Sequence, residues 1–419
     1  MIAAFRSLKT YNYRLWAAGA AVSNIGTWMQ RTAQDWIVLT ELTHNNGTAV
    51  GIVMALQFAP QVLLLPVTGF VADHVDRRKL LMATQATMGL LALGLGLLAV
   101  TGLVQLWQVY VFAFLLGCVT AFDAPARQTF VGDLVGEADL SNAVALNSAS
   151  FNAARLIGPA VAGVLISVVG SGWVFLINAA SFGGVIASLT FLRGKDLHPS
   201  IRAVRKRGSF VEGFRYVWRR PDLRSVLLML FLIGAFGFNY AIFISTMAVS
   251  VFHVGAHQFG LLTSIMAVGS VSGALLAAGR ARPRIGFLLV GAATLGLGFA
   301  LAAIMPNYWL FGLALVVIGI SAQTFTTTAN SLVQLSTEPA MRGRVLAILL
   351  AITLGGIPIG APIVGSIADT FGPRWALCVG AAAGFCSALV GLRYLVRHQG
   401  LKVRISGGRF RVSLGEKGS

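Results

Sequence analysis

A row of polar side chains follows one face of the first hydrophobic segment of this sequence. Its members recur at spacings of four, three and four residues, which is the periodicity of one helix face: Asn24, Trp28, Arg31 and Asp35. Asp35 is the only acidic residue well inside any hydrophobic segment. Burial favours the neutral form of a carboxyl group and a nearby arginine favours its charged form, so such a group can bind and release a proton. We predict proton coupling through Asp35, assisted by Arg31 or by Arg155 from a later segment.

Two simpler interpretations stay open. Arg31 and Asp35 can neutralise each other as a pair one helical turn apart, and Asp35 lies close enough to the end of its segment to be hydrated. Arg155 forms a similar stripe with Ser148 and Asn152. Because an unpaired charge in lipid costs several kcal/mol, both stripes are expected to face a cavity or a partner.

The composition indicates a membrane protein. Of the 419 residues, 56% are hydrophobic and only 11% are charged, and the mean hydropathy is +0.78, whereas soluble proteins carry about 25% charged residues. The net charge is +18, from 32 lysines and arginines and 14 acidic residues. All but three of the basic residues fall in segments predicted to lie on one side of the membrane; the exceptions are Arg31, Arg155 and Arg374. This positive-inside pattern predicts cytoplasmic termini and attraction to anionic lipid, with no role for nucleic acid.

Enzymatic and metal chemistry find no support in the residues. The three cysteines, Cys118, Cys378 and Cys386, have neither metal-ligand nor paired spacing. A glycine-rich lysine loop for phosphate and a nucleophile elbow are missing from the sequence. We therefore expect no enzyme, no cofactor, no metal site and no transport driven by ATP on this chain.

Helix length and loop punctuation predict an all-α membrane protein with twelve spanning helices. The expected spans lie near residues 14–41, 49–72, 80–102, 105–123, 140–169, 172–192, 224–251, 257–279, 284–304, 308–329, 343–368 and 374–396. The expected domains are a six-helix bundle at 1–192, a cytoplasmic linker at 193–223, a second six-helix bundle at 224–396 and a basic cytoplasmic tail at 397–419.

The two halves repeat in sequence. Five pairs of residues share one separation of 202 residues: Gly117 and Gly319, Gly158 and Gly360, Gly163 and Gly365, Gly170 and Gly372, and Trp173 and Trp375. Five coincidences in one register indicate a duplication. The duplication predicts two pseudo-symmetric six-helix bundles with a midplane cavity between them.

A charged loop, GFVADHVDRRK at residues 69–79, joins the second and third predicted spans. It resembles the loop signature of the major facilitator superfamily, with Gly69, Asp73, Arg77 and Arg78 in matching places and Asp76 in place of a second glycine. The resemblance implies a role in gating for these four residues. Two further residues at the inner end of the fourth span, Asp123 and Arg127, are expected to pair with Arg77 or Asp73 as an inner latch. A basic loop and a solvated helix end are the simpler interpretations.

The fifth predicted span contains ARLIGPAVAG at residues 154–163. Pro159 bends the helix, and the small residues on either side let another helix pack closely. The string is similar to the antiporter signature of drug-exporting major facilitators, although Ala162 replaces one glycine of that pattern. We predict a helix-packing motif formed by Gly158, Pro159 and Gly163, with Gly360 and Gly365 in the second half. An ordinary seam of small residues is the alternative.

A set of polar and aromatic residues is expected to line the substrate cavity: Asn24, Trp28, Asn152, Asn239, Tyr240 and Gln323. Such a lining suits a bulky, largely apolar ligand with a few polar groups. Each residue taken alone is equally well explained by packing or by a hydrogen bond between helices.

The strings TYNYRLWAAGAAVSNIGTWMQRTAQDWIVL, FDAPARQTFVGDLV and LSNAVALNSASFNAARLIGPAVAG narrow the resemblance. They look like the twelve-span drug–proton antiporter branch that holds enterobactin-exporter-like proteins. The resemblance implies a monomeric exporter of drugs, siderophores or secondary metabolites in the bacterial plasma (inner) membrane, with a small-molecule substrate, protons and membrane lipids as partners. The arginine that drug exporters often carry in the fourth span is missing from residues 111–122. A lipid or lysolipid flippase and a non-transporting accessory protein are the alternatives.

Overall fold

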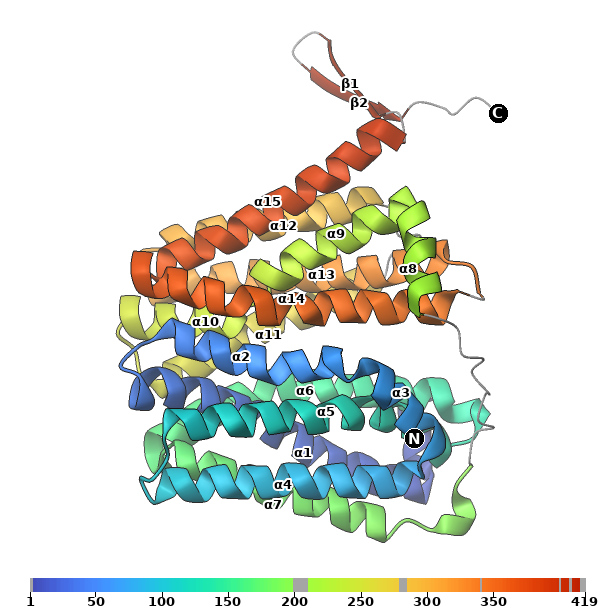
Figure 1. Ribbon diagram of the computed structural model, residues 1–419, viewed down its shortest axis with the longest axis vertical. Coiled ribbons are helices and arrows are strands. Elements are labelled where there is room, and N and C mark those ends of the chain that lie inside the picture. Colours follow the sequence, from blue (N-terminus) through green and yellow to red (C-terminus); the bar gives the residue numbers. More distant parts are fainter. Residues whose placement is uncertain are drawn as a thin grey trace. The chain divides into compact units, whose positions relative to one another are not determined.

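The computed structural model describes residues 3–198, 210–278, 285–339, 341–398, 401–406 and 409–414. Nearly all of this backbone is helical, and two short strands follow the last helix (Figure 1). Part of the predicted linker, residues 199–209, lies outside the described residues.

The chain divides into two compact units, which do not follow sequence order. Unit 1 comprises residues 1–204, 240–267 and 361–373, and unit 2 comprises residues 205–239, 268–360 and 374–419. The segments that lie wholly in unit 1 are η1 (Ala3–Lys9), α1 (Tyr11–Trp36), η2 (Ile37–Leu42), α2 (Gly47–Leu63), α3 (Leu65–His74), α4 (Arg77–Val100), α5 (Leu106–Leu134), α6 (Glu137–Val169), α7 (Ser171–Thr190), η3 (Gly194–Asp196), α10 (Tyr240–Thr246) and η4 (Met247–Val251). Those in unit 2 are α8 (Phe210–Arg219), α9 (Pro221–Phe236), α12 (Ile285–Ile304), α13 (Tyr308–Ser336), most of α15 (Pro373–His398), β1 (Leu401–Ser406) and β2 (Arg409–Leu414). Two helices, α11 (Ala256–Ala278) and α14 (Arg342–Phe371), contribute to both units. The predicted domain boundaries stay a prediction.

The twelve predicted spans are confirmed as helices, in the predicted order. Within the described residues, 10 helical segments are long and apolar enough to cross a membrane. The shorter apolar helix α2 and the more polar helix α1 complete the set. One predicted end is wrong, because α5 continues eleven residues past Asp123. Asp123 is not a solvated helix end, since it is 3% exposed and bonded to Thr84 of α4 and to Arg127 of its own helix.

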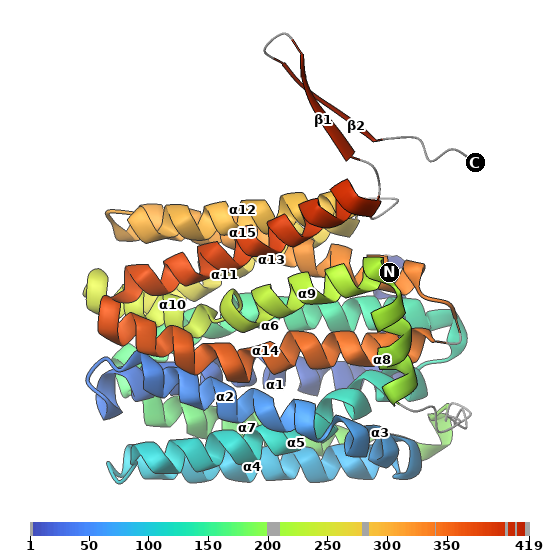
Figure 2. The same cartoon turned by 45° about the horizontal axis from the view of Figure 1, so that its top comes forward.

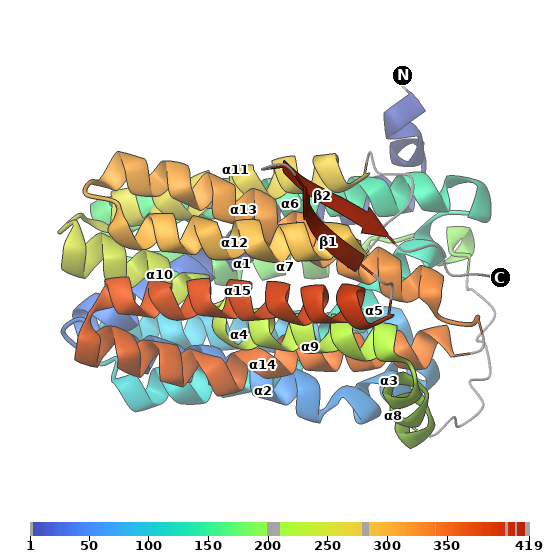
Figure 3. The same ribbon diagram turned by 90° about the horizontal axis from the view of Figure 1, so that it is seen from above.

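Each unit is built from helices packed side by side. In unit 1, α4 lies between α5 and α7, and α1 packs against α6 and α7 (Figures 1 and 2). In unit 2, α12 lies beside α13 (Figure 3). The later part of the predicted linker forms the amphipathic helix α8, which contacts α9 and runs across its direction (Figure 2). The long helices expose many apolar side chains, as expected for surfaces that face lipid.

Helix starts are set by local hydrogen bonds and by proline. The Asn46 side chain accepts a hydrogen bond from Ala49 N at 2.9 Å at the start of α2. Asp76, which replaces a glycine of the loop signature, caps α4 by accepting from Lys79 N at 2.9 Å. Pro221 occupies the first turn of α9, where its missing N–H has no partner to lose. The two caps and Pro221 fix where α2, α4 and α9 begin.

The predicted repeat is visible in the backbone. Gly170 and Gly372, 202 residues apart, both adopt positive φ, at 87° and 100°, where α6 and α14 give way to the following helices. A second match was not predicted: η2 and η4 are both π-helical turns, and each is followed by a histidine with positive φ, His44 at 49° and His253 at 52°. Residues other than glycine rarely adopt a positive φ, so its recurrence at His44 and His253 supports a duplicated fold.

The predicted tail contains a β-hairpin, an addition to the expected all-α architecture. Strands β1 and β2 pair antiparallel from Leu401 with Leu414 to Ser406 with Arg409. Their sequences, LKVRIS and RFRVSL, alternate apolar and polar residues around two glycines, which is the pattern of a hairpin.

Candidate functional site

Trp28 is the centre of a charged and aromatic cluster in unit 1. The guanidinium carbon of Arg31 lies 5.1 Å from the centre of the Trp28 ring, and that of Arg155 lies 5.7 Å from it. Phe151 packs edge-on against the same indole, with ring centres 5.8 Å apart. Three predicted site residues, from α1 and α6, are thus brought together. The sequence did not indicate that the indole lies beside both guanidinium groups.

Asp35 lies near this cluster, in the last turn of α1. Arg31 is close enough to interact electrostatically with both Asp35 and Arg155, and Arg155 in turn interacts with Tyr240 of α10. Asp35 and Arg31 are half-buried, and no hydrogen-bonded ion pair joins them in the part of the chain that the structure describes. A chain of polar groups therefore links α1, α6 and α10 within unit 1.

The remaining predicted cavity residues lie elsewhere or bond to groups a few residues away in sequence. Asn152 donates to Ser148 O at 2.8 Å, Asn239 donates to Ala235 O at 2.7 Å, and Gln323 donates to Thr327 Oγ1 at 3.3 Å. Asn24 accepts a hydrogen bond from Arg127, away from Trp28. Asn239 and Gln323 belong to unit 2 and the others to unit 1. A shared cavity lined by all six residues stays a prediction.

A buried carboxylate, Asp123, organises a second polar cluster in unit 1. It accepts hydrogen bonds from Thr84 Oγ1 and Gln85 Nε2, both at 2.8 Å, and pairs with Arg127 at 2.5 Å. Arg127 also donates to Asn24 Oδ1 at 3.0 Å. The cluster ties α1, α4 and α5 together.

The loop signature makes a different ion pair from the one predicted. Arg77 pairs with Asp133 at 2.8 Å, and Arg78 donates to the carbonyl oxygens of Leu189 and Thr190 at 2.8 and 3.0 Å. The predicted pairing of Arg77 with Asp123 is wrong, because Asp123 is already satisfied by three other side chains. Asp133 was missed, although it falls in the string FVGDLV that carried the family resemblance. Backbone at Gly69 and Asp73 belongs to α3, and their surroundings lie outside the described side chains.

The predicted small-residue motif forms two equivalent helix crossings in unit 1. In one, α6 meets α11: a Cβ on Gly163 would lie 2.6 Å from Ala256 O, and one on Gly260 would overlap Pro159 O. In the other, α14 meets α2, where Gly365 abuts Gly47 and Gly51 abuts Ala361. Residues of α6 and α14 correspond with a separation of 202, and residues of α2 and α11 correspond with a separation of 209. Only the separation of 202 residues had been recognised in the sequence.

The other two glycines of the motif pack against helices of their own half. A Cβ on Gly158 would lie 2.6 Å from the Cβ of Trp28, and one on Gly360 would overlap Ala235 O in unit 2. Gly158 thus lets α1 and α6 approach closely enough for Arg155 to reach the Trp28 ring.

Asp369 stabilises one of the two crossings, although no sequence pattern had indicated it. Its carboxylate caps the N-terminus of α2 by accepting from Gly47 N at 2.6 Å, Thr48 N at 2.8 Å and Thr48 Oγ1 at 2.5 Å. Free N–H groups and the helix dipole both favour a negative charge there. The equivalent position at the other crossing is Ser167, which bonds to Val164 O in its own helix.

Twelve membrane helices with an internal repeat and charged groups held within the spans define a membrane transporter of the major facilitator fold. Solved structures with this fold are similar over most of the chain. A POT family transporter in complex with a thioalcohol-conjugated peptide has a TM-score of 0.76 at 12% identity, covering 92% of this chain and 96% of that one. The nucleoside transporter NupG has a TM-score of 0.73 at 14% identity, covering 92% and 99%.

The chain belongs to the transmembrane secretion effector family of the major facilitator superfamily, whose model matches residues 2–412. It is 28% identical to the staphyloferrin A transporter of Staphylococcus aureus (83% of this chain, 87% of that one) and 26% identical to the enterobactin exporter EntS of Shigella flexneri (85% and 84%). It is 25% identical to the multidrug efflux pump Tap of Mycolicibacterium fortuitum (84% and 88%). The predicted family is confirmed: the chain is a multi-pass membrane transporter and not an enzyme.

Proposed function

We propose that this chain exports small, largely lipophilic molecules across the bacterial inner membrane by proton antiport. The observation that carries the proposal is the pair of arginines, Arg31 and Arg155, at the Trp28 ring, with Asp35 interacting with Arg31, inside predicted membrane spans. Ionisable groups within spans are costly, so they mark ion or substrate paths. Relatives that transport siderophores or drugs support export as the direction of transport.

Asp35 is the proposed proton carrier. Its attraction to Arg31 favours the carboxylate, and the surrounding helices disfavour it, so the balance shifts when the access of water to the cluster changes. Arg155 and Tyr240 extend the same polar chain to α10. Trp28 offers an apolar face with two cations beside it, which suits an aromatic substrate that carries negative charge.

In the proposed mechanism of alternating access, one gate closes at the outer end and another at the inner end. We propose cytoplasmic chain termini, which the positive-inside pattern supports, and assign the crossings at the starts of α2 and α11 to the outer gate. The Asp123 cluster and the Arg77–Asp133 pair then lie at the inner end. The packing of both crossings within unit 1 supports a state that is closed at the outer end. We propose that the transporter acts as a monomer.

The test uses the purified full-length chain in proteoliposomes with an imposed pH gradient. A lipophilic cationic dye, a tetracycline and a catecholate siderophore serve as probes, and their flux is followed with and without the gradient. We expect the gradient to drive the flux of at least one probe. Asp35→Asn is expected to abolish this gradient-driven part. The exposed Asp196, changed to Asn, is the matched control and should keep it. Gradient-driven flux that survives in Asp35→Asn would assign proton coupling to another group.

A further inference from the structure

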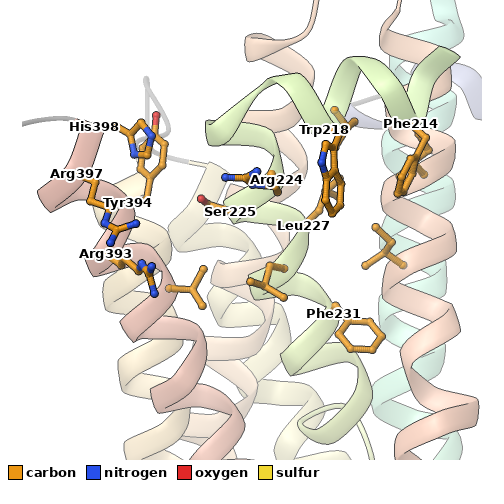
Figure 4. Close-up of a pocket in the computed structure, with 15 residues that line it drawn as sticks. Phe214, Trp218, Arg224, Ser225, Leu227, Phe231, Arg393, Tyr394, Arg397 and His398 are labelled. Carbon is orange, nitrogen blue, oxygen red and sulfur yellow. The ribbon is translucent and has the colours of Figure 1, made fainter. Parts of the chain in front are cut away.

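A pocket of about 480 Å³ opens on unit 2. Its walls come from α8, the first turns of α9, the second and third turns of α14 and the last turns of α15 (Figure 4). This volume is typical of small-molecule and cofactor sites, about 300–1,000 Å³. The pocket belongs to one unit only, so its shape does not depend on how the two units are placed.

Most of the pocket wall is apolar and aromatic. Phe214 and Trp218 stack with ring centres 5.7 Å apart, and they remain 47% and 60% exposed. Leu227 and Phe231 continue the wall along α9, as Figure 4 shows. An aromatic wall beside a cavity suits an apolar group.

One end of the same pocket is strongly basic. It carries three arginines and a histidine: Arg224, Arg393, Arg397 and His398. Figure 4 shows Arg224 directed from α9 toward the α15 side chains. The three arginines are exposed, and they form no ion pair with any described residue. Among the described residues no carboxylate lines the pocket, and the acids Asp222 and Glu212 are paired with Arg220 and Arg344. Within the part of the chain that the structure describes, the positive charge of the basic end is therefore not neutralised by an acidic side chain.

The pocket lies at the level where membrane helices end. The apolar run of α9 begins after Arg224, and α15 ends at His398. Trp218 and Tyr394 lie on opposite walls, and such aromatic residues are enriched where acyl chains meet headgroups. The amphipathic helix α8 contacts the start of α9 and runs across its direction, as an interfacial helix does.

We propose that this pocket binds one anionic phospholipid of the cytoplasmic leaflet. The phosphate lies among Arg224, Arg393 and Arg397, and the acyl chains extend along Leu227 and Phe231 toward the apolar side chains of α14. A free inorganic anion fits less well, because it leaves the aromatic wall bare. The lipid bridges α8 and α15, and it is a ligand separate from the proposed transport substrate.

The test measures lipid binding to the purified full-length chain in detergent by native mass spectrometry. Phosphatidylglycerol and phosphatidylcholine with the same acyl chains are titrated separately, and inorganic phosphate is added as a competitor. We expect one tightly bound phosphatidylglycerol and at least tenfold weaker binding of phosphatidylcholine. Millimolar phosphate should not displace the lipid.

Variants with equal charge loss locate the site. The double variant Arg224→Gln with Arg397→Gln removes two lining cations, each worth about fivefold in affinity, so binding should weaken about 25-fold. The control is Arg215→Gln with Arg219→Gln, two exposed arginines of α8 that do not line the pocket, and its binding should change less than twofold. If the first variant does not fold, Phe231→Ala tests the acyl wall and is expected to weaken binding of both lipids. Equal weakening in both double variants, unchanged binding in Arg224→Gln with Arg397→Gln, or displacement by phosphate would overturn the proposal.

Discussion

Removing the Asp369 carboxylate should loosen the crossing of α2 and α14. The carboxylate accepts two backbone hydrogen bonds, from Gly47 and Thr48, and one from the Thr48 hydroxyl. Asp369 is exposed, so solvent weakens the attraction between its carboxylate and the N-terminus of α2. Loss of the cap is expected to destabilise the closed crossing by about 1 kcal/mol. That cost raises the population with an open crossing about fivefold. Asp369→Asn keeps an acceptor without the charge and should fall between Asp369→Ala and the unchanged protein.

A buried reporter beside the cap measures this population. Ala368 is 5% exposed and faces Gly47, so a cysteine at this position reacts with a polar maleimide only when the crossing opens. The three native cysteines are first replaced by alanine, because two of them are exposed. The labelling rate is proportional to the open population when closing is faster than the chemistry. We expect a rate about fivefold higher in Asp369→Ala.

Thr370→Ala is the control, since this exposed neighbour bonds only to Ser366 O among the described residues. Its labelling rate should match that of the parent protein. The cap would have no part in closing the crossing if Asp369→Ala left the rate unchanged. A general loosening of the α14 end would be indicated if Thr370→Ala raised the rate as much.

Three further changes test the packing and the polar clusters. Gly260→Ala places a methyl group against Pro159 O and should abolish gradient-driven flux in proteoliposomes. The control Gly183→Ala, with open space around it, should keep this flux. Equal flux in both variants would show that the close approach of α6 and α11 is unnecessary. Asp123→Asn weakens the bonds of a buried carboxylate and should reduce the free energy of unfolding by about 1–3 kcal/mol, seen as a lower midpoint in thermal unfolding in detergent. Trp28→Leu removes the ring beside two guanidinium groups, worth about 0.5–1 kcal/mol each, and should lower the same midpoint more than Trp28→Phe does.

The spans were predictable because each depends on a local property of the chain. Runs of apolar residues and loop punctuation located all twelve helices, and the spacing of Asn24, Trp28, Arg31 and Asp35 placed them on one helix correctly. The end of α5 was predicted at residue 123, because a charged residue usually marks where a span leaves the membrane. Asp123 is instead satisfied by Thr84 and Gln85 of α4. Local sequence holds no information about those partners.

The capping and pairing acids were not predictable for a related reason. Asp369 caps a helix start 322 residues away in sequence, and Asp133 pairs with Arg77 across 56 residues. Near a helix end, an acidic residue has the same local pattern whether it is hydrated or paired. Asn24 has a partner that its position on the stripe with Trp28 did not indicate, because Arg127 donates to it from another helix.

The two crossings share their packing and differ in their charge. Gly260 against Pro159 and Gly51 against Ala361 keep the same close approach of backbones, and any side chain at either glycine meets a carbonyl oxygen. Duplication preserves such contacts because each glycine has no tolerated substitute at that distance. Charge is not constrained in this way, and a carboxylate caps α2 where the other half has Ser167. The α2–α14 crossing therefore has an electrostatic attachment that the α6–α11 crossing lacks, which gives the two symmetric contacts different costs of opening.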